Sequence, residues 1–189
     1  MKTKLIIMII LFAVTSINSQ EKLPYREIPV MAESYTAQNT VARMIDGLAF
    51  RYYWSTDKLE PVDLAYQPKG EGRTCQQTVN HLYDLSNMML LLTKTEFKQV
   101  LEKDKMTFLT MRKQTLLNLQ ALSNRIKESE NLLEFTVINE GGIRIPFFNI
   151  INGPIADAIW HTGQVASFRR SSGNPISSKI NHFKGTVNE

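Results

Sequence analysis

The sequence predicts an all-α protein, a helical bundle with one small extended or hairpin excursion before its last helix. Apolar residues recur at helical spacing along four long stretches, and the connections between them are too irregular for a β fold. The chain has 189 residues, which predicts one domain large enough to bury a core.

Residues 1–19 are predicted to be a secretory signal peptide. A short basic start leads into an apolar run from Leu5 to Val14, and a polar stretch follows, with cleavage expected after Ser19. The apolar run is too short for a comfortable membrane span, which argues against an uncleaved anchor. We therefore expect an exported protein, periplasmic or secreted, without stable membrane insertion after cleavage.

Composition narrows the classes of partner. Cleavage would remove Lys2 and Lys4 and no acidic residue, so the formal net charge of +4 would fall to +2. A balance so close to neutral gives no reason to expect nucleic-acid binding, which needs a clustered basic face. The single cysteine, Cys75, excludes an internal disulfide, so the exported protein must rely on its core or a ligand for stability.

The first helix is expected over roughly residues 35–56, after a polar, proline-bearing lead at residues 20–34. One apolar stripe at helical spacing indicates this helix, and it consists of Val41, Met44, Ile45, Leu48 and Tyr52. Prolines and glycines between residues 56 and 72 then predict an ordered connection.

Two further helices follow this connection. Thr74 with Gln77 three residues later is typical of a capping box, which predicts a helix start there. The apolar stripe of this helix contains His81. Another helical pattern opens at Thr95 and, after a break, keeps helical spacing to about Glu128.

The last part of the chain changes character twice. Alternating apolar residues around a glycine-containing turn predict the hairpin or extended excursion between residues 134 and 147. The last helix is expected from about Gly153, or earlier, to Ser171. Residues 177–189 form a polar tail without a convincing period, so the predicted bundle covers residues 35–176.

Three residues carry the candidate chemistry. Asp157 and His161 are four residues apart in the last helix, a spacing that puts both on one face about one turn apart. His81 lies on the inner face of the second helix. Two imidazoles and a carboxylate converging from two helices would supply three metal ligands and leave a coordination position open for water or substrate.

Each of these residues also has a structural explanation. A histidine on an inner face is often a neutral imidazole that is hydrogen-bonded in the core. Asp157 near a helix N-terminus would meet the helix dipole favourably, by about 0.3–1 kcal/mol, without a metal. His182 in the polar tail is most simply a solvated surface residue.

The mature chain resembles a known family, the DinB/YfiT-like superfamily of metalloenzymes, over nearly its whole length. Two segments carry the specific part of this resemblance. These segments are Thr74–Leu85 and Asp157–Gln164. The resemblance implies an up-down-up-down four-helix bundle. It also implies a bound divalent transition metal, with zinc as the first expectation and nickel, iron or manganese as alternatives.

The family's ligand positions are matched in part. His81 matches the family's ligand on the second helix. The family typically has a His-x-x-x-His pair that ends in Arg-Gly-Gln on the last helix. His161 matches the second histidine of that pair, whereas Asp157 stands in place of the first and Thr162 replaces the arginine. Aspartate is a competent ligand for these metals, so His81, Asp157 and His161 are the implied metal ligands.

The resemblance implies a metal-dependent enzyme that acts on an unknown small molecule. Relatives include transferases and an isomerase that use low-molecular-weight thiols. Those thiols are cytosolic and this chain is expected to be exported, so metal-assisted hydrolysis is the favoured chemistry. One alternative is a non-catalytic binding module with a vestigial site. The other is a structural or partner-binding bundle, with a homodimer as one form.

Several neighbours of the candidate ligands have more than one explanation. Gln164 and Trp160 could line the pocket, although Trp160 could equally be a core or surface aromatic. Arg169 and Arg170 could bind an anionic substrate or meet the dipole of the last helix. Cys75 at a helix N-terminus could have a lowered thiol pKa, or it could be a small, partly buried residue.

Overall fold

The computed structural model describes residues 22–96 and 101–188, so the predicted signal peptide lies outside the described residues. The chain is mostly helical with two small two-stranded sheets, which confirms the all-α class in this coarse form. The helical elements are α1 (Ala37–Thr56), α2 (Pro61–Ala65), α3 (Cys75–Leu92), η1 (Lys103–Lys105), α4 (Phe108–Lys127), η2 (Leu132–Phe135), α5 (Phe147–Ile150), the π-helical segment η3 (Ile151–Ile155) and α6 (Ala156–Ser171). The strands are β1 (Val137–Ile138), β2 (Arg144–Ile145), β3 (Ile180–Asn181) and β4 (Thr186–Val187).

Side-chain caps fix the starts of the long helices. The predicted capping box of α3 is confirmed, because the Gln77 N–H donates to Thr74 Oγ1 at 3.1 Å and the Thr74 N–H donates to Gln77 Oε1 at 2.8 Å. Thr36 and Thr107 cap α1 and α4 in the same way, each accepting from a backbone N–H three residues later. These caps satisfy donors that would otherwise lack partners at the helix starts.

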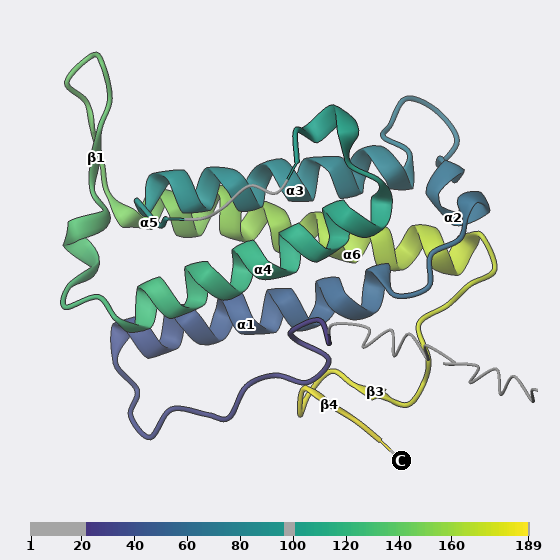
Figure 1. The fold of residues 1–189 in the computed structure, drawn as a ribbon, viewed down its shortest axis with the longest axis horizontal. Coiled ribbons are helices and arrows are strands. Elements are labelled where there is room, and N and C mark those ends of the chain that lie inside the picture. The colour runs from purple at the N-terminus through teal and green to yellow at the C-terminus, as the bar shows by residue number, and fades with distance from the viewer. Residues whose placement is uncertain (1–21, 97–100, 189) are drawn as a thin grey trace, which may run out of the picture.

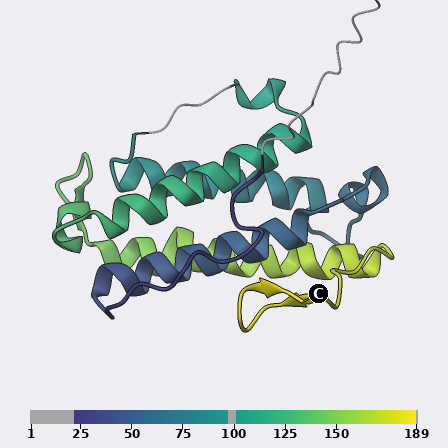
Figure 2. The ribbon, with the colours of Figure 1, turned by 60° about the horizontal axis from the view of Figure 1, so that its bottom comes forward.

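Helices α1, α3, α4 and α6 lie side by side (Figures 1 and 2). Helix α4 packs against α1 and α3, and α6 packs against α3 and α1. Helices α1 and α6 run in one direction, whereas α3 and α4 both run in the opposite direction (Figure 1). The contacts agree with this order. Arg112 near the start of α4 donates to Thr56 at the end of α1, and Asn118 in mid-α4 donates to Ser86 in mid-α3, each at 2.9 Å.

The up-down-up-down order expected from the family resemblance is therefore wrong for α4 and α6, because the four helices run up-down-down-up. Helix α3 has 18 residues, a length of about 27 Å. The connection over residues 93–107 is long enough, when extended, to return along that length, so α4 can start beside the start of α3. The helical pattern predicted from Thr95 is wrong at its start, because Thr95 and Glu96 are not helical and α4 begins only at Phe108. Residues 97–100, within that pattern, lie outside the described residues.

The core lies between these helices. Its largest fully buried side chains are Tyr52, Tyr83, Phe50, Phe135, Ile45, Leu48, Met89, Leu90, Leu116, Leu122, Ile126 and Ile150. Met44 and Met88, which were predicted on the inner stripes, are 40 % and 47 % exposed. Both lie at the edges of their stripes, where the neighbouring helix no longer covers them.

A buried carboxylate attaches the N-terminal lead to the helices. Asp46 of α1 accepts hydrogen bonds from the Tyr25 hydroxyl at 3.0 Å and from Ser123 of α4 at 2.6 Å. Lys127 Nζ lies 3.1 Å from its other oxygen. This buried charge is therefore paired and hydrogen-bonded, as burial of a carboxylate requires.

A second buried network joins the ends of α1 and α6 to α2. Arg169 donates to the carbonyl oxygens of Trp54 and Asn174, each at 2.6 Å. Asn174 Nδ2 then donates to Asp63 Oδ2 at 2.7 Å. Burial would raise the pKa of Asp63, but hydrogen bonds and the nearby Arg169 charge outweigh burial and hold this pKa below its ordinary value.

Two short hairpins complete the chain. The predicted excursion is confirmed, because β1 and β2 pair antiparallel with Val137 opposite Ile145. The tail differs from expectation, since β3 and β4 also pair antiparallel and the Ile28 N–H donates to the Gly185 carbonyl at 2.9 Å. Gly185 has φ +74°, and a Cβ there would overlap Ile28.

No helix among the described residues has both the length and the apolar character needed to cross a bilayer.

Candidate metal centre

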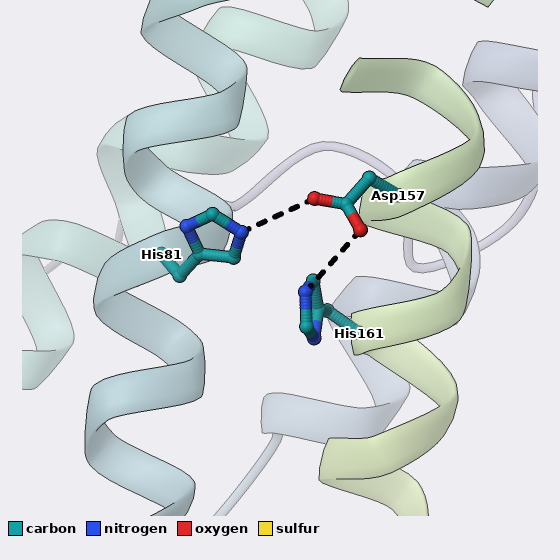
Figure 3. A group of neighbouring side chains, drawn as sticks. All are labelled: His81, Asp157 and His161. Atoms are coloured by element: carbon teal, nitrogen blue, oxygen red, sulfur yellow. Dashed lines mark hydrogen bonds and ion pairs between the residues drawn. The ribbon is translucent and has the colours of Figure 1, made fainter. Parts of the chain in front are cut away.

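The three predicted ligand residues meet between two antiparallel helices. His81 projects from α3, and Asp157 and His161 project from α6 (Figure 3). His81 Nε2 lies 3.2 Å from Asp157 Oδ2, and His161 Nε2 lies 3.3 Å from Asp157 Oδ1. One ligand atom from each residue can be chosen so that all three lie within 4.8 Å of one another, so this group could hold one metal ion.

The backbone before α6 brings Asp157 to this place. The π-helical segment η3 contains Gly153, at non-helical φ −88° and ψ −105°, and Pro154, which has no N–H to donate. The Ala156 N–H donates back to the carbonyl of Ile151, so helical hydrogen bonding continues from η3 into α6. Asp157 lies in the first turn of α6, shortly after the break at Gly153, so a favourable contact with the helix dipole also explains this residue.

The distances suit a small divalent ion. Zinc binds imidazole nitrogen and carboxylate oxygen at about 2.0–2.2 Å, so two ligand atoms of a tetrahedral site lie about 3.3 Å apart. The observed separations of 3.2 Å and 3.3 Å have this length but run to the two different oxygens of Asp157. One ligand atom from each residue gives a set that lies within 4.8 Å, so the three side chains would close slightly around an ion. Two nitrogens and one oxygen also form a ligand set that zinc, nickel, iron and manganese accept.

The hydrogen bonds of His161 favour a cation at its Nε2. Its Nδ1 lies 2.7 Å from Gln164 Oε1, whereas its Nε2 lies 3.3 Å from Asp157 Oδ1 and 3.4 Å from the donor Arg73 Nη1. A neutral imidazole has only one N–H. Donation from Nδ1 to Gln164 leaves the Nε2 lone pair facing inward, which is the usual arrangement of a metal-binding histidine.

The three side chains are only partly buried, so solvent can reach the group. The side chains of His81, Asp157 and His161 are 26 %, 42 % and 12 % exposed, so none is sealed in the core. Three protein ligands would leave at least one coordination position for water or a substrate. This arrangement is typical of catalytic rather than structural zinc sites.

The two predicted pocket residues have different positions. Gln164 contacts His161 directly and orients its ring. Trp160 is 71 % exposed, so of the expectations for this residue the structure supports the surface aromatic. Successive residues of an α-helix are about 100° apart, and this step turns Trp160 outward when His161 faces α3.

Three further residues from the sequence are explained by the fold. Arg169 is 4 % exposed and bonded to backbone carbonyls, so it joins chain segments and is not available to an anionic substrate. Burial and the charge of Asp63 raise the pKa of Cys75 to about 11, partly offset by Arg169, so its helix N-terminus does not activate the thiol. His182 is exposed, as predicted, and its ring packs edge-to-face on Phe50.

One residue of the site was missed. Arg73 comes just before the start of α3, and its Nη1 lies 3.4 Å from His161 Nε2. The sequence does carry a signal for it, namely a basic residue at a helix N-terminus, the end at which the helix dipole disfavours positive charge.

Comparisons with known proteins return no match among protein families, curated proteins or solved structures. Membership of the DinB/YfiT-like superfamily therefore stays a prediction, and the function is argued from the site itself.

Proposed function

We propose that this chain is an exported, metal-dependent enzyme of the DinB/YfiT-like type, built on a four-helix bundle of α1, α3, α4 and α6. His81, Asp157 and His161 hold one divalent transition metal, with zinc preferred, and the enzyme hydrolyses an unknown small molecule. The convergence of these three side chains from α3 and α6 is the observation that carries the proposal.

Each residue has a definite part in this proposal. A divalent ion at this place supplies a Lewis acid that lowers the pKa of a coordinated water towards neutrality. His81 and His161 present neutral imidazoles, and Asp157 supplies the negative charge that favours a dication over a neutral group. Gln164 fixes the ring of His161 by accepting from Nδ1, as partners of metal-bound histidines commonly do.

The second candidate function is a non-catalytic binding module with a vestigial site. It is favoured by one observation, because the 3.2 Å and 3.3 Å separations are also hydrogen-bond lengths, so Asp157 could simply bridge two histidines. The accessible position beside the group favours the enzyme instead, since a purely structural bridge needs no access from solvent.

Export and assembly are further parts of the proposal. The basic, apolar and polar pattern of residues 1–19 supports export, and sequencing of the exported product is expected to begin at Gln20. A product that keeps its first residues would contradict cleavage.

A homodimer remains a prediction, and light scattering of the mature protein would test it.

Turnover tests the enzyme proposal. The mature protein, loaded separately with zinc, nickel, iron or manganese, is incubated with panels of small esters, amides and phosphoesters. We expect hydrolysis of at least one class by a loaded protein, loss of that activity on chelation, and loss in His81→Ala. Trp160→Ala is the matched control and keeps the activity, because that side chain is 71 % exposed and is not a proposed ligand. Stoichiometric metal without turnover of any class would favour the binding module.

A further inference from the structure

Arg73 is held beside the candidate metal centre by the start of α3. The next residue, Thr74, is fixed by its reciprocal hydrogen bonds with Gln77. The Cys75 N–H also donates to the Tyr66 carbonyl at 2.9 Å, which ties this turn to the segment after α2. The backbone of Arg73 is therefore well placed, and its exposed side chain extends to His161 on α6.

Helix stability does not explain a cation at this position. The N-terminus of a helix carries partial positive charge, so a basic residue there costs about 0.3–1 kcal/mol at an exposed site. The first turn of α3 contains no acidic residue that would offset this cost. Within the part of the chain that the structure describes, the interaction found for Arg73 is the one with His161 Nε2, and no carboxylate forms an ion pair with it.

The charges of the site leave Arg73 without an internal counter-ion. Both carboxylate oxygens of Asp157 face histidine nitrogens. When a metal takes the Nε2 lone pair of His161, Arg73 must give up its contact with that atom. Its guanidinium is then a cation without a partner, next to the divalent metal ion. The single negative charge of Asp157 neutralises only part of the metal's charge, so the site as a whole carries excess positive charge.

The geometry points to Arg73 as the substrate-binding cation of this site, and to a substrate that carries an oxyanion, a carboxylate or a phosphate, next to the bond that reacts. This inference rests on the proposed metal centre. The planar guanidinium donates two parallel N–H bonds that match a carboxylate or phosphate edge. An anion here also faces the positive end of α3, so the helix start and Arg73 favour the same charge.

Anion binding to a cobalt-loaded protein tests this assignment without a known substrate. Cobalt(II) takes the place of zinc, and its visible absorption reports ligands that enter its coordination sphere. The full mature wild type, Arg73→Gln and Arg144→Gln are titrated with acetate, with inorganic phosphate and with imidazole as a neutral ligand. Arg144 is an exposed arginine on β2 and serves as the matched control.

We expect Arg73→Gln to weaken acetate or phosphate binding by about tenfold or more, which is the contribution of one charge-assisted contact. Imidazole affinity should stay within about twofold in the same variant, and Arg144→Gln should match wild type throughout. The anion whose affinity falls more in Arg73→Gln, acetate or phosphate, identifies whether the substrate carries a carboxylate or a phosphate.

Three results would overturn the assignment, and they are distinguishable. Unchanged affinity for both anions in Arg73→Gln, with cobalt still bound, would remove Arg73 from substrate binding and leave the metal centre intact. Tighter cobalt binding in Arg73→Gln, with anion affinity unchanged, would show that Arg73 is a cation that competes with the metal. Absence of cobalt absorption from the wild type would overturn the metal centre together with this inference.

Discussion

Replacing Asp157 with alanine is expected to lower the affinity for zinc by at least about a hundredfold. The loss of a residue that only orients a metal ligand commonly costs about 10- to 100-fold, and Asp157 is a proposed ligand and the negative charge of the group. Its two oxygens are also the atoms that both histidines face. Competition with a chromophoric chelator measures this affinity.

Two other residues of α6 give this experiment a graded control. Gln164→Ala should lower zinc affinity by about tenfold, because it removes the acceptor that orients His161 without removing a ligand. Trp160→Ala should leave the affinity unchanged, since that side chain is 71 % exposed and outside the group. Equal affinities in wild type, Asp157→Ala and Gln164→Ala would show that zinc binds elsewhere.

Arg169→Ala is expected to destabilise the protein by about 3–5 kcal/mol, the cost typical of breaking a buried charged network. The change removes hydrogen bonds to the carbonyls of Trp54 and Asn174 and leaves these part-buried acceptors without that donor. It also removes the positive charge near Asp63. Urea unfolding of the mature protein, followed by circular dichroism, measures the free energy of unfolding.

Arg170→Ala is the matched control for this prediction. Arg170 is the next residue of α6 and is exposed, so its loss should change the free energy of unfolding by no more than about 0.5 kcal/mol. If Arg169→Ala were as stable as Arg170→Ala, the buried network would contribute little.

Local signals in the sequence predicted the helices well, but not the direction of each one. The caps and apolar stripes depend on neighbours three or four residues apart, so Thr74 with Gln77 identified the start of α3. The direction of α4 depends on where the connection after α3 returns. The length of that connection permits either direction, so packing between distant segments decides it.

The site was predictable where its residues share one helix. The four-residue spacing of Asp157 and His161 places both on one face of α6, and the position of His81 on the inner face of α3 made its approach plausible. Arg73 was missed because its contact with His161 crosses 88 residues of sequence and comes from a turn. Trp160 is exposed because one residue of helical rotation separates it from the inward-facing His161.

The central claim, that His81, Asp157 and His161 together bind one metal ion, is tested most directly by metal content. The mature protein is made without a histidine tag, reconstituted in turn with zinc, nickel, iron or manganese, freed of excess ion and measured by elemental mass spectrometry beside His81→Ala. We predict close to one equivalent of at least one metal, zinc first, in the wild type, and its loss in the variant. Wild-type protein that retains none of the four metals, or His81→Ala that retains as much as wild type, would contradict the claim.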